Sequence, residues 1–198
     1  MNKVDILEND ILQRYPDVLA ELLRDHTTGR NIFWATNDYE ELGDGYNFVD
    51  EITIEIITGS NEGVIKPRVL KSKENQKGRA QKMAEIFTPS WICNAQINLV
   101  DNDWFGREGV FNAVSEDQCT WEATTEPIIF LKGKTWKDYV RSTRLEITCG
   151  EAPYLVSRYD TTTGNFIPIQ QRIGMLDRKL RVVNENTKTP EEWLEMAE

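Results

Sequence analysis

The stretch from Arg144 to Val156 combines residue types suited to binding a nucleotide-like ligand. Residues 145–148 predict a short strand, Cys149 and Gly150 predict a tight turn, and the apolar run from Tyr154 to Val156 predicts the start of a helix. A strand, a glycine turn and a helix in this order place backbone N–H groups and a helix N-terminus at the carboxyl end of the strand. Open α/β sheets bind nucleotide-like ligands at that edge. The stretch is therefore the first candidate for a binding site.

The same residues, Glu146-Ile-Thr-Cys149-Gly150-Glu-Ala152-Pro-Tyr154-Leu, resemble the first motif of the DNA adenine methyltransferases, Asp-Pro-x-Cys-Gly-x-Gly-x-Phe-Leu. A second element of that family, Tyr/Phe-Thr-Pro, is matched upstream by Phe87-Thr88-Pro89, in the family's order. More broadly, the chain is similar to short restriction-endonuclease methylation subunits of gut bacteria and their phages. The resemblance implies a pocket for S-adenosylmethionine, the methyl donor.

The resemblance also implies a role for each matched residue. Phe87 would pack on the adenosyl part of the donor, with Thr88 and Pro89 fixing the turn beside it. Gly150 would let the backbone pass close to the methionine part, and Glu146 would accept a hydrogen bond from the donor's amino group. The site implied in this way consists of Phe87, Thr88, Pro89, Glu146, Cys149, Gly150, Ala152 and Tyr154.

Three residues depart from the family motif. Ile147 replaces a proline, Ala152 replaces the second glycine, and Pro153 removes one backbone donor from the turn. The alternative interpretation is a strand–turn–helix unit that keeps the architecture and has lost the ligand.

The methyl-transfer motif of the family, Asp/Asn-Pro-Pro-Tyr/Phe, has no counterpart, because the sequence contains no Pro-Pro pair. We therefore expect no catalytic residue and no methyl transfer by this chain alone. The resemblance covers the N-terminal, donor-binding part of such an enzyme, completed by a partner or left by truncation. A remnant without activity is a further interpretation.

The segment from Arg68 to Glu85 is the most basic part of the chain and predicts a helix. Lys73, Lys77 and Arg79 are the candidates for contacts with DNA phosphates. A solvated helix face explains the same charges.

The overall charge indicates a different kind of partner. The formal net charge is −10, whereas DNA-binding proteins usually present a basic face. An acidic surface can occupy the basic cleft of a nucleic-acid-handling protein. The second hypothesis is therefore a non-catalytic, phage-borne inhibitor of a defence nuclease, of the anti-restriction or anti-CRISPR kind. Its candidate contact residues form an acidic loop: Asp38, Glu40, Glu41 and Asp44.

Hydrophobic periodicity and capping signals predict the remaining elements. Strands are expected at 31–36 and 50–58, and an irregular surface insertion at 102–125. The large aromatic residues of the second half are expected to pack in a core, with base stacking as the alternative. Helices are expected from residue 4 to 25 in two pieces divided at Pro16, and over 90–100, 135–140, 170–184 and 190–198.

These elements predict an α/β fold in which a helical N-terminal region, residues 1–70, precedes an incomplete methyltransferase-type (Rossmann-like) core, residues 71–198. Three widely spaced cysteines and one histidine indicate neither a disulfide framework nor a metal site. The sequence has no long apolar run and no signal peptide, which predicts a cytoplasmic protein without a membrane segment. The sequence does not specify the oligomeric state.

Overall fold

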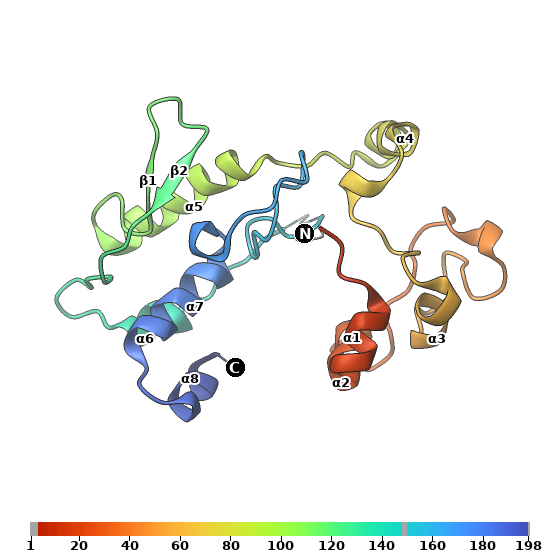
Figure 1. The fold of residues 1–198 in the computed structure, drawn as a ribbon, viewed down its shortest axis with the longest axis horizontal. Helices are drawn as coiled ribbons and strands as arrows, with labels where there is room; N and C mark the ends of the chain where they lie inside the picture. The colour runs from red at the N-terminus through yellow and green to blue at the C-terminus, as the bar shows by residue number, and fades with distance from the viewer. Residues whose placement is uncertain (1–3, 148–149, 198) are drawn as a thin grey trace. The chain divides into compact units, whose positions relative to one another are not determined.

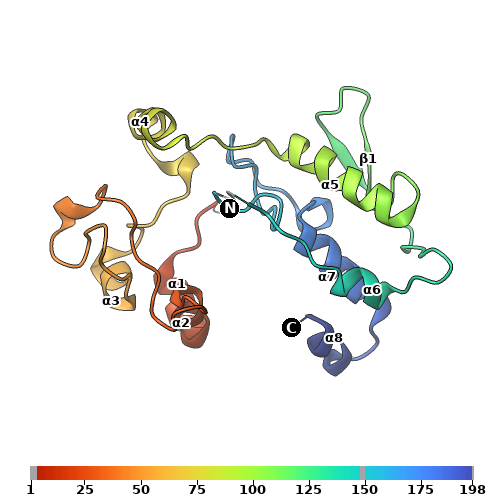
Figure 2. The same ribbon diagram turned by 180° about the vertical axis from the view of Figure 1, so that it is seen from behind.

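A computed structural model describes residues 4–147 and 150–197 of the chain. These residues form two compact units, the first ending at Leu70 and the second beginning at Lys71. Figures 1 and 2 show the elements of the two units from two sides. No helix in the described part of the chain has the length and apolar composition needed to cross a membrane.

The first unit consists of short helices joined by turns (Figure 1). Helix α1 (Glu8–Arg14) is followed directly by α2 (Pro16–Leu23). Pro16 is the first residue of α2, where its fixed φ and missing N–H favour helix initiation, so the predicted division of this region at Pro16 is confirmed. The other elements are single turns: η1 (Glu40–Leu42), α3 (Ile54–Ile57), η2 (Gly59–Asn61) and η3 (Arg68–Leu70).

The core of the first unit is apolar and aromatic. Two buried aromatic residues, Trp34 and Tyr46, lie with ring centroids 5.5 Å apart. Each satisfies its polar group inside the unit, because the Trp34 indole donates to the Gly45 carbonyl (2.9 Å) and the Tyr46 hydroxyl to the Ile56 carbonyl (2.7 Å). The remaining buried members are Leu19, Leu23, Ile52 and Ile57.

The strand predicted over residues 50–58 is wrong, because Ile54–Ile57 form the helical turn α3. The Thr58 hydroxyl donates to the Ile54 carbonyl (2.7 Å) and closes this turn. The carbonyl of Ile56 is taken by Tyr46. The carbonyl groups of Ile54 and Ile56 therefore accept from side chains and are not used to pair with another strand. The alternation of apolar residues at 50–58 was not sufficient to predict a strand.

The strand predicted over residues 31–36 is reduced to isolated antiparallel bridges. Asn31 pairs with Arg24, and Phe33 pairs with Glu51. The segment is extended, but its neighbours do not continue alongside it as strands.

The second unit contains the longest helices and the sheet (Figures 1 and 2). Its helices are α4 (Lys73–Met83), α5 (Ser90–Phe105), α6 (Trp136–Arg141), the single turn η4 (Ile169–Gln171), α7 (Met175–Asn186) and α8 (Pro190–Ala197). Helices predicted at these places are confirmed, apart from their ends. Helix α6 lies beside α7 in both views.

The sheet is a two-stranded antiparallel hairpin. Strand β1 (Asn112–Val114) pairs with β2 (Trp121–Ala123), so that Ala113 lies opposite Glu122. Both strands fall within residues 102–125, and the prediction of an irregular surface insertion there is wrong. The reason is burial: Phe105, at the end of α5, and Phe111, before β1, are both core residues.

The strand predicted at residues 145–148 is also wrong for residues 145–147, which are irregular chain with a bend at Ile147; Thr148 lies outside the described residues. The chain after Tyr154 makes a turn and does not continue as the predicted helix. The described fold is therefore mixed α and β, with helices and a small antiparallel sheet.

The apolar core of the second unit lies between α5, α6, α7 and the hairpin. Its buried aromatic members pack edge to face or tilted, with Phe105 at 5.2 Å from Tyr139 and 5.8 Å from Phe111 between ring centroids. Trp104 and Trp136 pack against the same cluster, so aromatic packing in a core is confirmed for them.

A charged network is buried beside these aromatic rings. The side chain of Arg178, only 1% exposed, donates to the Asp101 carboxylate (2.6 Å) and to the side-chain oxygens of Asn94 and Asn98 (2.8 Å each). Asn112 of β1 exchanges hydrogen bonds with Asn94 (2.9 and 3.1 Å). The network joins α5, α7 and the hairpin, and each charge in it has a partner.

Candidate functional site

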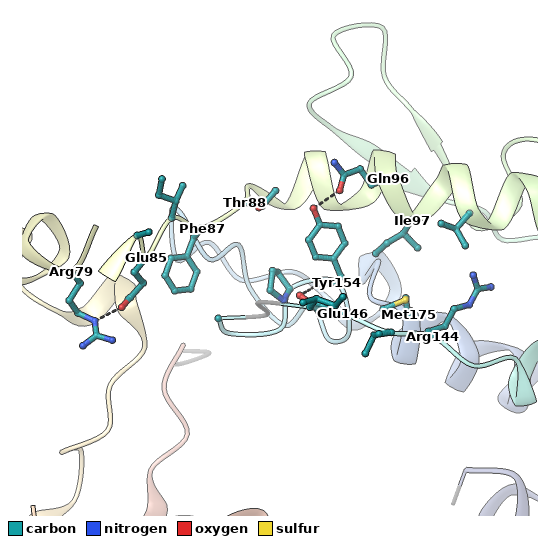
Figure 3. Close-up of a pocket in the computed structure, with 17 residues that line it drawn as sticks. Arg79, Glu85, Phe87, Thr88, Gln96, Ile97, Arg144, Glu146, Tyr154 and Met175 are labelled. Atoms are coloured by element: carbon teal, nitrogen blue, oxygen red, sulfur yellow. Dashed lines mark hydrogen bonds and ion pairs between the residues drawn. The ribbon is translucent and has the colours of Figure 1, made fainter. Parts of the chain in front are cut away.

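The second unit contains a cavity of about 890 Å³. Its wall is formed by the end of α4 with residues 84–88, one face of α5, residues 144–147, the turn at 150–154 and the first residue of α7. Figure 3 shows Arg144 and Met175 at one end of this cavity and Arg79 and Glu85 at the other. The volume lies within the range of ligand-binding pockets, roughly 300 to 1,000 Å³.

The Phe87–Pro89 segment is held by a turn far away in the sequence. The Ser90 N–H at the start of α5 donates to the Asp160 carboxylate (2.7 Å), and the Thr161 hydroxyl donates to the Thr88 carbonyl (3.2 Å). Although burial opposes it, hydrogen bonds from Thr162 and from the Ser90 N–H lower the pKa of Asp160. Asp160 therefore caps α5 as a carboxylate.

The two motifs that suggest a donor site meet at Gly150. A Cβ built on Gly150 would lie 3.2 Å from Cε1 of the Phe87 ring, so the glycine backbone packs directly against this ring. The φ of Gly150 is +52°, a conformation that glycine adopts without steric cost. Close approach and positive φ together explain why a glycine is needed here.

Glu146 shapes the turn that follows Gly150. Its carboxylate accepts hydrogen bonds from the N–H groups of Leu155 (2.9 Å) and Tyr154 (3.4 Å). These two N–H groups belong to the turn whose backbone donors were predicted to bind a ligand. Glu146 was predicted to accept a hydrogen bond from the ligand. In the structure its carboxylate also fixes the turn at Tyr154 and Leu155.

Tyr154 crosses the cavity from the turn toward α5, as Figure 3 shows. Its hydroxyl donates to Oε1 of Gln96 (2.5 Å). Burial raises the pKa of Tyr154, so the phenol stays neutral near pH 7. Close by, burial raises the pKa of the Cys93 thiol to about 11, which makes this buried cysteine a poor nucleophile.

The N-terminus of α7 is closed by the same turn. The carbonyl groups of Tyr154 and Leu155 accept from the N–H groups of Met175 (2.7 Å) and Leu176 (3.0 Å). A Cβ on Gly174 would lie 2.4 Å from the Leu155 carbonyl oxygen, so only glycine fits. These N–H groups at the start of α7 are therefore satisfied inside the unit. The helix start that the sequence suggested as a ligand site, at residues 154–156, is a turn and not a helix.

Five of the eight residues implied for the donor site line the cavity: Phe87, Thr88, Glu146, Gly150 and Tyr154. Pro89 and Ala152 belong to the same segments but do not line it. Ala152 has a φ of +50°, a left-handed conformation that disfavours alanine relative to the glycine of the family motif. Cys149 lies outside the described residues.

The three residues predicted to contact DNA are not equivalent. Lys73 and Lys77 are exposed on α4, whose start is capped by the Ser72 hydroxyl. Arg79 instead lines the cavity, where it forms an ion pair with Glu85.

Several cavity residues were missed by the sequence analysis, chiefly Gln96, Ile97 and Val100 on one face of α5, with Arg144 and Met175. The spacing of three and four residues on α5 was a usable signal for a shared helix face. Arg144 gave no such signal, because its position depends on Asp101, which is distant in the sequence.

The acidic loop of the first unit is exposed. Asp38, Glu40, Glu41 and Asp44 all lie at the surface. Residues 1–70 contain 14 acidic and 6 basic residues, a formal net charge of −8, whereas residues 71–198 contain 19 acidic and 17 basic residues, a charge of −2. The acidity is thus concentrated in the unit that does not contain the cavity.

Comparisons with protein-family models, with curated proteins and with solved structures find no match to this chain. The geometry of the cavity and the distribution of charge therefore carry the functional inference.

Proposed function

We propose that the cavity binds S-adenosylmethionine and that the chain is the donor-binding component of a DNA adenine methyltransferase-like system of restriction–modification. One observation carries this proposal. Residues from two motifs far apart in the sequence, chosen for their resemblance to one ligand site, line one cavity and touch at Phe87 and Gly150. The same proposal includes the relation of residues 71–198 to a Rossmann-like methyltransferase core.

The chemistry of the wall suits such a ligand. The Phe87 ring offers a flat apolar surface to a purine, and Ile97 and Val100 offer aliphatic surface to the rest of the ligand. Gln96 and Glu146 supply polar groups at the middle of the cavity, where Figure 3 shows Tyr154 between them. An apolar cavity with a few placed polar groups is typical of small-molecule sites.

The proposal concerns donor binding and does not extend to methyl transfer by this chain. The sequence holds no Pro-Pro pair for gripping a flipped adenine. In the proposed system a separate polypeptide supplies that function, and the purified chain leaves adenine in DNA unmethylated.

The test is calorimetric titration of the full chain with S-adenosylmethionine. We expect binding in the micromolar range, abolished in Gly150→Trp and weakened roughly tenfold to a hundredfold in Phe87→Ala, since aromatic stacking on a base contributes about 1–3 kcal/mol. Phe48→Ala is the matched control, because Phe48 is an exposed phenylalanine of the first unit, and it should bind like the wild type. The absence of heat with the wild-type chain would refute the proposal.

A second candidate function follows from the distribution of charge. The first unit carries a formal charge of −8, and its acidic loop stands beside exposed apolar side chains, including Leu42 (55% exposed) and Val49 (71%). Carboxylates mixed with apolar groups suit the basic cleft of a nuclease. In this alternative the chain inhibits a restriction or CRISPR nuclease.

The alternative is tested by adding the chain to DNA-cleavage reactions of such nucleases. Inhibition should disappear when Asp38, Glu40, Glu41 and Asp44 are changed to the corresponding amides. Inhibition that survives these changes would remove the acidic loop as its cause.

A further inference from the structure

The end of the cavity at Arg144 has an excess of positive charge. The Arg144 side chain is 15% exposed and lines the cavity, and its Nη2 lies 3.3 Å from Oδ1 of Asp101. The same carboxylate already accepts from Arg178 (2.6 Å) and from the Tyr139 hydroxyl (3.0 Å). One carboxylate is therefore shared between two guanidinium groups.

A third cation adds to this excess. The Lys179 ammonium donates to the carbonyl of Ser142, two residues before Arg144. Burial and then the charge of Arg144 lower the pKa of Lys179. The charge of the Asp101 carboxylate acts on the same pKa in the opposite direction. Asp101 supplies one negative charge beside these three cations. The other nearby carboxylate, Glu146, is bonded to the Tyr154 and Leu155 N–H groups. A ligand group with negative charge would therefore be favoured beside Arg144.

The guanidinium of Arg144 is held in place but keeps unused donors. Its carbon lies 5.7 Å from the centre of the Tyr139 ring, and Asp101 is bonded to one of its terminal nitrogens. A guanidinium has five N–H donors, and one of them is used in this contact. A preorganised cation with unused donors in the wall of a cavity suits a carboxylate or a phosphate oxygen.

The surroundings of Arg144 restrict the ligand further. Ile97, Val100, Leu145 and Met175 line the same cavity and present apolar surface. A free inorganic ion gains little from such surface, whereas a ligand with an apolar body and one anionic group gains from both. We infer that the Arg144 end of the cavity is an anion subsite, which receives the carboxylate or phosphate of a ligand whose body lies along the cavity toward Phe87.

If the ligand is S-adenosylmethionine, a point that rests on the proposed function, the anion is the carboxylate of its methionine part. The adenosyl part then lies at Phe87, at the other side of Tyr154 in Figure 3. The subsite itself does not depend on that ligand, because it follows from the charges around Asp101.

The first experiment compares S-adenosylmethionine with its decarboxylated form, which keeps the sulfonium and lacks the carboxylate. We expect the wild-type chain to bind the carboxylated form roughly tenfold more tightly or better, as for a hydrogen bond between charged groups. Arg144→Gln should lose this preference and Arg144→Lys should keep part of it. Arg141→Gln, an exposed arginine at the end of α6, should behave like the wild type.

The second experiment uses inorganic phosphate without the donor. At constant ionic strength, phosphate in place of chloride should raise the thermal midpoint of the wild type and of Arg141→Gln, but not that of Arg144→Gln.

A phosphate effect without donor binding would support the subsite and refute the proposed function. Equal binding of the two donor forms by the wild type would overturn the subsite and leave donor binding standing. Absence of both effects would overturn both inferences. If Arg144→Gln does not fold, the comparison of the two donor forms in the wild type decides.

Discussion

The two units of this protein place their charged residues in opposite ways. The first unit buries aromatic and aliphatic side chains and leaves its acidic residues at the surface, where they give the unit a charge of −8. The second unit is nearly balanced in charge but buries an arginine and an aspartate beside three buried aromatic rings and three asparagines. Surface charge acts on partners at a distance, whereas buried charge fixes the geometry of a site. The cavity thus lies in the unit with buried charge, and the exposed acidic residues are concentrated in the other unit.

The largest effect is expected from breaking the buried charge network. Arg178→Met leaves Asp101, Asn94 and Asn98 without their shared donor and should destabilise the second unit by about 3–5 kcal/mol. Hydrogen exchange measured peptide by peptide in urea would show lost protection in residues 71–197 and unchanged protection in residues 4–70. The double variant Asp101→Leu with Arg178→Met should lose less than the sum of the single variants. Equal loss of protection in both units would contradict the prediction that the network stabilises the second unit alone.

A smaller effect is expected where the turn packs against α7. Gly174→Ala forces a methyl group against the Leu155 carbonyl and should cost about 1–3 kcal/mol of the free energy of unfolding. Gly78→Ala is the matched control, because nothing lies near its Cβ and a glycine inside a helix is disfavoured. The control should be stabilised by roughly 0.5–1 kcal/mol. Urea denaturation of both variants measures the contrast, and a neutral Gly174→Ala would show that the turn is free to move away.

The cap of α5 should make the second unit sensitive to acid. The pKa of Asp160 is lower in the folded chain than the ordinary aspartate value of 3.8, so its contribution is present above that pH and is lost as the pH falls toward the folded value. Asp160→Asn should cost about 1 kcal/mol at pH 7, the usual contribution of a helix cap. The difference in unfolding free energy between the variant and the wild type should shrink below pH 4. A difference that is constant from pH 7 to pH 3 would mean that the charge of Asp160 is not involved.

The smallest effect on stability is expected in the acidic loop of the first unit. Changing Asp38, Glu40, Glu41 and Asp44 to amides should alter the free energy of unfolding by less than about 0.5 kcal/mol for each substitution, because all four are exposed. Donor binding should be unchanged in the same protein. A large loss of either would show that the first unit does more than present a charged surface.

Local signals in the sequence determined most of the helices. Pro16 begins α2, Pro190 begins α8, and Thr135 with Asp138 forms a capping box at α6. Each signal acts on residues within one or two turns, so the sequence alone was sufficient to predict these helices. The pairing of Phe87 with Gly150 was suggested by the resemblance to one ligand site, and no local rule would have found it.

Only the tertiary structure decided the strands and the charged end of the cavity. The alternation at residues 50–58 and the short run at 145–148 both predicted strands. In the structure Ile54–Ile57 form a helical turn, and residues 145–147 are irregular chain in which the Glu146 carboxylate accepts from the turn that follows. Arg144 and Arg178 acquire their roles from Asp101, 43 and 77 residues away. Burial and charge pairing between distant residues depend on how the whole chain folds, and for that reason they cannot be inferred from the neighbouring residues in the sequence.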